Sequence, residues 1–279
     1  MKAITAIGIG GAFALLLLAV LMEGGNPMSF LNIPALLIVI GGTSGATIAS
    51  TRPTGFKSMV TGAKLAFRGA ETNLDGTVES MVALSEKARR DGLLALEDDI
   101  DALDDEFAKK GIQLVVDGAD SELVRAILAG EIDGMSARHN YIAKIFATAG
   151  GFAPTLGILG TVMSLVHVLE NLDSPSSLGH SIAGAFIATL YGVGSANLVV
   201  LPISNKLKEL SADELLYREM MLEAILSIQA GDNPRLLREK LETFLAPGAR
   251  GLAAAAAAAA KEAAAPPEDV EPDPETAAV

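Results

Sequence analysis

The sequence predicts an all-α, polytopic membrane protein with four transmembrane helices and a helical cytoplasmic domain. Of its 279 residues, 50% are hydrophobic, and its mean hydropathy is +0.41, both high for a soluble protein. Four stretches contain no Asp, Glu, Lys or Arg, and each is about long enough to cross a bilayer core of roughly 30 Å at about 1.5 Å per residue. The predicted spans are residues 3–22, 33–50, 147–169 and 181–201.

Basic residues predict the orientation of these spans. None of the 21 Lys and Arg residues lies in the turns 23–32 and 170–180, which join the spans in pairs. All of them lie at the N-terminus, between Arg52 and Lys144, or from Lys206 onward, and basic residues favour the cytoplasmic side. We therefore expect a multi-pass protein of the cell inner (cytoplasmic) membrane, with both termini in the cytoplasm and both turns in the periplasm.

Residues 1–50 are expected to form a tight transmembrane hairpin. A secretory signal peptide is the alternative for the first span, but no A-x-A-like cleavage site follows it and a second apolar stretch comes directly after. In the second span, small residues spaced by four would let another backbone approach closely. These residues are Gly41, Gly45 and Ala49.

Residues 51–146 are polar enough to form the cytoplasmic domain. Their apolar residues recur at helical spacing, which predicts four or five short helices continuous with the second and third spans. One segment, SEKARRDGLLALEDDIDALDDEF, places basic residues before acidic ones, among them Arg89, Arg90 and Glu97. The residues alone leave two interpretations open: a solvated helix face with internal ion pairs, or a docking surface that uses both signs of charge.

The domain 147–207 holds the third and fourth spans, and each span carries small or hydroxyl residues, with a proline in the third, on one helical face. Small and hydroxyl residues make no favourable contact with lipid chains, so we expect such a face to meet a neighbouring helix or a narrow polar path. The third-span face carries Pro154, Gly157, Thr161 and Ser164, and the fourth-span face carries Ser181, Ala185, Thr189, Gly192 and Ala196.

Hydroxyl groups on these faces predict an ion path that is incomplete. Thr161, Ser164 and Thr189 can line and hydrate a path for H⁺ or Na⁺, but they cannot carry charge through hydrocarbon. His167 lies near the outer end of the third span and is interpreted as an interfacial residue. If ions pass, a partner polypeptide must supply the carboxylate, so the sequence predicts one component of a channel.

Two prolines mark the inner ends of these spans. Pro154 removes a helix hydrogen bond in the third span, and Pro202 removes one just past the fourth. Each is either a helix boundary or static kink, or a hinge through which an ion-driven change in the membrane moves the cytoplasmic helices.

The C-terminal part changes composition abruptly. Residues 208–246 predict cytoplasmic helices, and residues 247–279 form an alanine- and proline-rich acidic tail that is expected to be disordered and has no assigned role. The net charge of −13 argues against nucleic acid as a partner. With no cysteine, three scattered histidines and no catalytic motif, we expect no metal site, no cofactor and no enzyme activity.

Two strings of residues carry a resemblance to a known family. APTLGILGTVMSLVHVL and IATLYGVGSANLVVLPISNKLK are similar to the third and fourth spans of the MotA/PomA family of flagellar motor stator subunits. The order of two spans, a cytoplasmic helical domain, two further spans and a polar C-terminal helix resembles the same family over roughly residues 1–245. The resemblance implies that Pro154 and Pro202 couple ion flow to conformational change and that Thr161 and Thr189 face the ion path.

The same resemblance implies partners. Arg89 and Glu97 match the family's charged pair at the rotor interface, which favours docking on a FliG-type protein of the rotor switch complex, with Arg90 beside them. It further implies a ring of five subunits around two copies of a MotB/PomB-type partner, whose single span carries the essential aspartate and whose periplasmic domain grips peptidoglycan. Proton and sodium versions share this architecture, and Asn32, where some sodium-type members carry an acid, weakens the sodium option without excluding it.

Two other functions stay open. A subunit of the related ExbB/TolQ type, an energy-transducing proton channel, has three spans with the large cytoplasmic insertion after the first, so the additional N-terminal span favours a stator. A structural scaffold without transport would tolerate a bulky apolar residue at Thr189, whereas a stator would lose ion flux.

Overall fold

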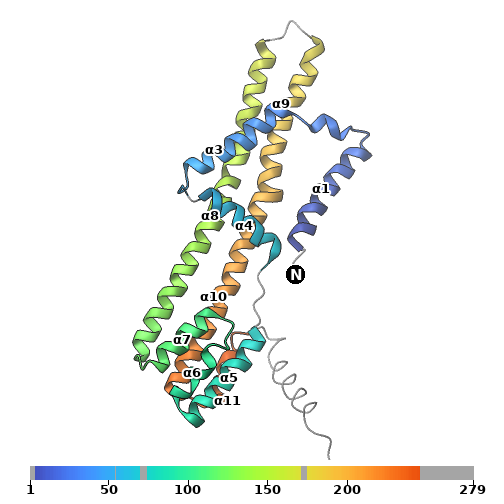
Figure 1. Ribbon diagram of the computed structural model, residues 1–279. Helices are drawn as coiled ribbons and strands as arrows, with labels where there is room; N and C mark the ends of the chain where they lie inside the picture. Colours follow the sequence, from blue (N-terminus) through green and yellow to red (C-terminus); the bar gives the residue numbers. More distant parts are fainter. Residues whose placement is uncertain (1–3, 54, 70–73, 171–174, 246–279) are drawn as a thin grey trace, which may run out of the picture. The chain divides into compact units, whose positions relative to one another are not determined.

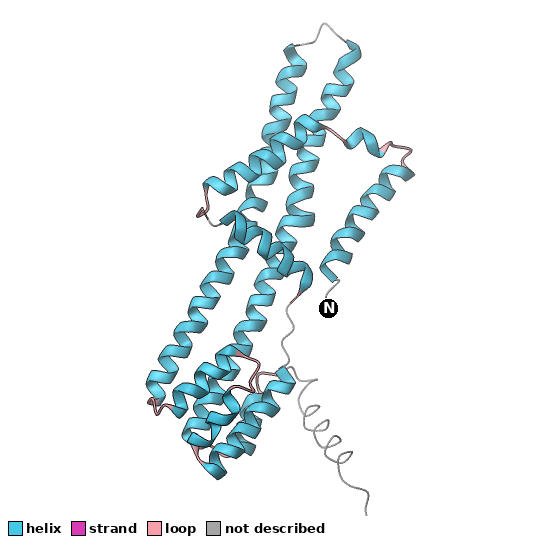
Figure 2. Cartoon of the chain, viewed as in Figure 1, coloured by secondary structure: helices cyan, strands magenta, loops and turns pink. Residues whose placement is uncertain are grey.

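The computed structural model describes residues 4–53, 55–69, 74–170 and 175–245, which form helices and connecting turns (Figure 1). Figure 2 shows no strand in this part of the chain, which confirms the all-α class. The chain divides into two compact units, Met1–Thr72 with Ala129–Leu216, and Asn73–Leu128 with Tyr217–Val279. Two long helices, α8 (Ser121–Glu170) and α10 (Leu201–Ala230), contribute residues to both units.

The first unit contains the apolar helices. Three helical stretches, Ile4–Met22, Ser121–Glu170 and Ser181–Ala230, are long and apolar enough to cross a membrane, and the second predicted span falls on a shorter apolar helix, Ile33–Ala49. Besides α8 from Ala129 and α10 to Leu216, the unit contains α1 (Ile4–Met22), η1 (Pro27–Phe30), α2 (Ile33–Leu36), η2 (Leu37–Gly41), α3 (Gly42–Ala49), α4 (Gly55–Arg68), α9 (Pro175–Ser195) and η4 (Ala196–Val200).

The expected tight hairpin of the first two spans does not form in the described chain. α1 has no buried residue, and its main contacts are with η1, α4 and η4 instead of the second-span helix. A Cβ atom added at Gly41 or Gly45 would meet no atom within 4 Å, so the small residues are not a packing face inside this chain. The prediction was wrong because the second span buries Thr43 and Thr47 and not its glycines. Helices in lipid associate through close packing and polar contacts, which the spacing of small residues alone does not assign to a partner.

The second-span helix, made of α2, η2 and α3, packs on α9. Its Val39 lies in a buried cluster with Ile187 and Ala188. The Asn32 side chain caps α2 by accepting a hydrogen bond from the first turn at 3.0 Å, and its backbone N–H donates to the Tyr191 hydroxyl at 3.3 Å. These contacts fix where the helix starts and which helix it meets.

Only one of the two expected continuities between spans and polar helices is present. α8 runs for 50 residues without interruption, so the third span is continuous with the helix before it. α3 ends at Ala49, and the chain turns before α4 begins at Gly55, so continuity after the second span was wrong. In this turn the Arg52 N–H donates to the Tyr141 hydroxyl at 2.9 Å, and the Arg52 guanidinium carbon lies 5.1 Å from the ring centroid.

The second unit is a compact cluster of short helices and the ends of the two long ones. Its core includes Leu96, Ile112, Leu128 and Leu241, all fully buried. Gly111 lets α7 approach α10 closely, because a Cβ atom there would lie 2.3 Å from the end of the Ile225 side chain. The elements are α5 (Leu74–Asp91), η3 (Leu93–Leu96), α6 (Glu97–Ile100), α7 (Glu106–Val116), the start of α8, the end of α10 and α11 (Pro234–Glu242).

The predicted C-terminal segment, residues 208–246, is helical over most of its described part, but its first helix, α10, begins earlier, at Leu201. α10 ends at Ala230 and α11 begins at Pro234, and between them Gly231 takes a positive φ of +73° that ends the helix. The predicted tail, residues 247–279, lies outside the described residues.

Candidate functional site

The polar faces of the third and fourth spans meet each other. A Cβ atom added at Gly192 would lie 2.5 Å from the backbone oxygen of Ala153 and 2.9 Å from the Gly157 Cα. One added at Gly157 would lie 3.0 Å from the backbone oxygen of Ala188. α8 and α9 therefore touch backbone to backbone here, which is the close approach that small residues permit between apolar helices.

Next to this contact, two threonine hydroxyls lie together. Thr161 Oγ1 is 2.5 Å from Thr189 Oγ1, 2.9 Å from the backbone oxygen of Ala185 and 3.1 Å from that of Gly157. Each hydroxyl has one proton, so both are satisfied when Thr161 donates to a carbonyl and Thr189 donates to Thr161. This arrangement leaves both lone pairs of the Thr189 oxygen available to a water molecule or a cation.

The other predicted path residues lie nearby in the chain but outside this pair. Ser164 is half-buried, one turn beyond Thr161 on the same face of α8. His167 is exposed in the last turn of α8, which agrees with an interfacial residue. Within residues 147–169 and 181–201 no side chain carries a full charge at pH 7 when His167 is neutral.

Both predicted coupling prolines lie inside continuous helical segments, so neither ends a helix. Pro154 is in the interior of α8, and its missing N–H leaves the Gly150 carbonyl without its usual helical partner. A Cβ atom at Gly150 would lie 2.5 Å from the Leu201 side chain, which directly precedes Pro202. The two proline regions are therefore in contact through Gly150 and Leu201.

Two π-helical turns interrupt the spans, and nothing in the residue pattern predicted them. η4, Ala196–Val200, ends just before Pro202, and η2, Leu37–Gly41, lies in the second span. Such wide turns are rare and often lie at functional positions. Buried hydroxyls accompany them: Thr47 donates to the Thr43 carbonyl at 2.7 Å, and Ser204 donates to the Ala143 carbonyl at 2.8 Å.

In the second unit, the predicted rotor-facing residues lie on either side of a turn. Arg89 and Arg90 are exposed in the last turn of α5, and Gly92 ends that helix with φ of +89°. Glu97 is exposed at the start of α6. Arg90 pairs with Asp91 at 2.8 Å, which lowers the pKa of the Asp91 carboxyl through a hydrogen bond from the guanidinium.

α5 is held from behind by α11. The Arg238 guanidinium makes a two-pronged contact with the Glu79 carboxylate, one prong at 2.8 Å. This hydrogen bonding lowers the pKa of Glu79 and raises that of Arg238, against an opposing effect of burial. A second ion pair joins Arg218 to Asp105, the residue that caps α7, and here a single nitrogen, Arg218 Nη1, lies 2.6 and 2.8 Å from the two carboxylate oxygens.

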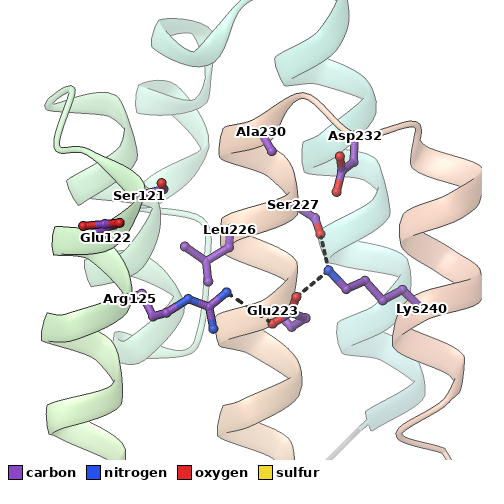
Figure 3. Close-up of a pocket in the computed structure, with 9 residues that line it drawn as sticks. All are labelled: Ser121, Glu122, Arg125, Glu223, Leu226, Ser227, Ala230, Asp232 and Lys240. Carbon is purple, nitrogen blue, oxygen red and sulfur yellow. Dashed lines mark hydrogen bonds and ion pairs between the residues drawn. The ribbon is translucent and has the colours of Figure 1, made fainter.

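A polar pocket of about 280 Å³ opens between α8, α10 and α11 within the same unit (Figure 3). Figure 3 shows Arg125 and Lys240 pointing from opposite sides toward Glu223, with which both form ion pairs. Lys240 also donates to the Ser227 hydroxyl at 3.2 Å. Because the Glu223 carboxylate of α10 pairs with one cation from α8 and one from α11, this cluster ties the three helices together.

Comparisons with known proteins give the arrangement a context. Residues 99–220 match the family described as the MotA/TolQ/ExbB proton channel family. The chain is 39% identical to "Motility protein A" of Borreliella burgdorferi over 244 residues, which cover 88% of this chain and 94% of that protein. Among solved structures it is similar to the C. jejuni MotAB structure, with a TM-score of 0.85 and 30% identity, over 88% of this chain and 97% of that chain. It is also similar to the flagellar MotAB stator complex from Bacillus subtilis, with a TM-score of 0.83, 36% identity and the same shares of each chain.

Proposed function

Because the chain belongs to the MotA/TolQ/ExbB proton channel family, and to its motility protein A members, we propose that it is a flagellar motor stator subunit. With a MotB-type partner it forms a cation channel and converts ion flow into torque on the rotor, which drives flagellar rotation and motility. Its likeness to motility protein A extends over almost the whole of that protein, whereas ExbB and TolQ enter only through the name of the wider family.

One observation carries the proposal at the level of the site. Thr161 and Thr189 form a hydroxyl pair where α8 and α9 touch, in spans that contain no carboxylate. Such a wall can hydrate H⁺ or Na⁺, but the proton or cation carrier must come from another polypeptide. A MotB-type partner with an aspartate in its single span supplies that group.

The driving force is of usable size. One elementary charge that crosses the membrane releases about 2.3 kcal/mol per 100 mV before any concentration gradient is counted. In this proposal ions pass between the partner helix and the wall of Thr161, Ser164 and Thr189. The changes that follow are taken up at Pro154 and Pro202, where the helices lack a backbone hydrogen bond.

The assembly and its orientation complete the proposal. Five copies of the chain surround two copies of the partner, and both termini of each copy lie in the cytoplasm, as the distribution of basic residues favours. Arg89, Arg90 and Glu97 then lie on the cytoplasmic side, where they contact a FliG-type protein of the rotor. Their exposure, and the brace of α11 behind α5, suit a docking surface.

The test removes one hydroxyl without changing the shape of the side chain. We expect Thr189→Val, co-expressed with the partner, to lower cation flux into vesicles by about tenfold, because a hydrated cation loses one ligand of roughly 1–2 kcal/mol. Swimming under separately clamped sodium and proton gradients identifies the ion.

The matched control is Thr155→Val, since Thr155 is exposed on α8 and bonds only to the Phe152 carbonyl of its own helix, at 2.7 Å. Equal flux in the two variants and the parent would exclude Thr189 from the path. Normal swimming in a strain that lacks this chain would reject the stator function itself.

A further inference from the structure

A groove between α1 and the η4–α10 segment, all within the first unit, is not used by the ion path. Its volume is about 440 Å³, within the usual range of small-molecule sites. One wall is the face of α1 that includes Thr5, Gly8 and Ile9, and the other includes Leu198, Pro202 and Lys206.

The groove changes from apolar to polar along its length. Ile9 and Ala12 of α1 lie opposite η4, which contributes Leu198 and the Asn197 amide, and the amide N–H already donates to the Val193 carbonyl at 2.9 Å. Towards the start of α1 the lining becomes polar, with the Thr5 hydroxyl on one side and the Asn205 amide, the Lys206 ammonium and the carboxylate of Glu209, its ion-pair partner, on the other. A ligand that fits has a hydrocarbon part and, at one end, an acceptor group with negative charge.

We propose that this groove is a binding site for an anionic phospholipid, with the phosphate at Lys206 and Asn205 and an acyl chain along Ile9 and Leu198. Basic pockets between transmembrane helices near the membrane surface commonly hold such headgroups. The Lys206 side chain is 25% exposed, so its aliphatic part lies against protein while the ammonium reaches the polar end.

The ion pair that Lys206 already makes does not compete strongly with a phosphate. Lys206 Nζ lies 3.0 Å from a carboxylate oxygen of Glu209, but the Glu209 side chain is 63% exposed. Pairs as exposed as this contribute little, because solvent and salt screen them. A phosphate in the groove gains the ammonium together with the hydroxyl and amide donors beside it.

Charge complementarity favours a lipid over a second copy of this chain. A neighbouring copy would bring one of its apolar spans to this groove, and the four spans, residues 3–22, 33–50, 147–169 and 181–201, contain no Asp or Glu. These spans contain no anionic group that could pair with the Lys206 ammonium, whereas every anionic phospholipid has a phosphate that can. Because the groove includes Pro202 and η4, an occupying lipid would also stabilise the wide turn next to that proline.

The first test fills the groove. Gly8 lines it, and a Cβ atom there meets no atom within 4 Å, so Gly8→Leu adds a side chain at the wall of the groove, where the acyl chain would lie. Gly10→Leu is the matched control, because Gly10 is equally open but does not line the groove. The full-length chain with its partner is purified from nanodiscs of phosphatidylcholine and phosphatidylglycerol, and bound lipids are counted by native mass spectrometry.

The second test removes the charge. Lys206→Gln is compared with Lys208→Gln, an exposed lysine two residues away that does not line the groove. We expect the parent and the two controls, Gly10→Leu and Lys208→Gln, to retain phosphatidylglycerol, and Gly8→Leu to lose it. We expect the preference of Lys206→Gln for phosphatidylglycerol over phosphatidylcholine to be about fivefold lower than that of the parent.

Three results would overturn the proposal. The first is equal retention of phosphatidylglycerol by Gly8→Leu and Gly10→Leu. The second is a parent that shows no preference for phosphatidylglycerol over phosphatidylcholine. The third is a lower subunit count in Gly8→Leu, which would assign the groove to a neighbouring copy. If Gly8→Leu yields no folded protein at all, the comparison of Lys206→Gln with Lys208→Gln decides alone. The lipid count does not depend on motility, so its failure would leave the stator function untouched.

Discussion

Gly192 lies against the backbone of α8 with no room for a methyl group. We predict that Gly192→Ala destabilises the α8–α9 contact by about 1–3 kcal/mol, because the new Cβ atom would lie 2.5 Å from the backbone oxygen of Ala153 and the helices must move apart. Gly194→Ala is the control, since its Cβ atom meets nothing within 4 Å. Thermal unfolding of the two variants in the same detergent measures the difference, and equal midpoints would contradict the close contact.

At the scale of residues, the sequence predicted which side chains share a helical face but not which faces meet. The three- and four-residue spacing placed Gly157 and Thr161 on one side of the third span, and Thr189 and Gly192 on one side of the fourth. The distance of 2.5 Å between the two threonine hydroxyls depends on how α8 and α9 cross, which no spacing within either helix contains. The roles of these residues in ion flow stay predictions.

The brace between α5 and α11 belongs to the scale of whole elements. We predict that Arg238→Gln loosens α11 from α5 and lowers the stability of the second unit by about 1 kcal/mol, since Glu79 loses a bidentate partner at a partly exposed position. Arg235→Gln on the same helix is the control, because the Arg235 side chain is 86% exposed and its nearest acidic oxygen, from Glu239, is 3.7 Å away. Hydrogen exchange in α5 and α11 reports the loosening, and identical exchange in both variants would refute the brace.

The same pair gives a prediction for acid. The hydrogen bond from Arg238 lowers the pKa of Glu79 below its ordinary value of 4.5. A lowered pKa in the folded state means that this stabilisation is present above about pH 4.5 and is lost as the pH falls through the lowered value. Acid unfolding of the parent should therefore be steeper in this range than that of Glu79→Gln, and curves of the same slope would show that the pair does not contribute.

At the scale of elements, the sequence predicted where the apolar helices lie but not how they bend, break and pair. Uncharged stretches predicted where apolar helices lie, because composition alone decides that. The wide turns at residues 37–41 and 196–200 were missed, since the residues there do not differ in type from those of an ordinary apolar helix. The break after Ala49 was missed although Pro53, which disfavours helix in the residue before it, follows closely. The contact of Glu79 with Arg238 joins residues 159 apart, and many other acidic and basic residues would have matched by charge.

At the scale of the whole molecule, the charged surface makes the proposed function testable. We predict that Arg89→Ala and Glu97→Lys each reduce torque while membrane assembly stays intact, because both side chains are exposed and support no core contact. Glu239→Lys is the control for the charge reversal, since Glu239 is also exposed, with 62% of its side chain accessible, but lies on α11. Rotation speed of tethered cells is the measurement, and normal speed in both variants would reject the docking role.

A second whole-molecule prediction concerns dependence on the partner. The spans of this chain contain no carboxylate, so the purified chain in vesicles should conduct neither H⁺ nor Na⁺ at a measurable rate until the MotB-type partner is present. Ion-sensitive dyes inside the vesicles follow the flux. Full conduction by the chain alone would show that the path does not need a second polypeptide.

The meeting of Gly157 with Gly192 has a mechanical consequence. At the point where these two helices touch, neither has a side chain, so they can tilt about that point without side chains having to pass one another there. Thr161 and Thr189 lie on one side of this point of contact, and Gly150 and Leu201 lie on the other. A small change in the crossing angle of α8 and α9 would therefore move the two hydroxyls apart and bring the two proline regions closer together. The opposite change in angle would reverse both movements.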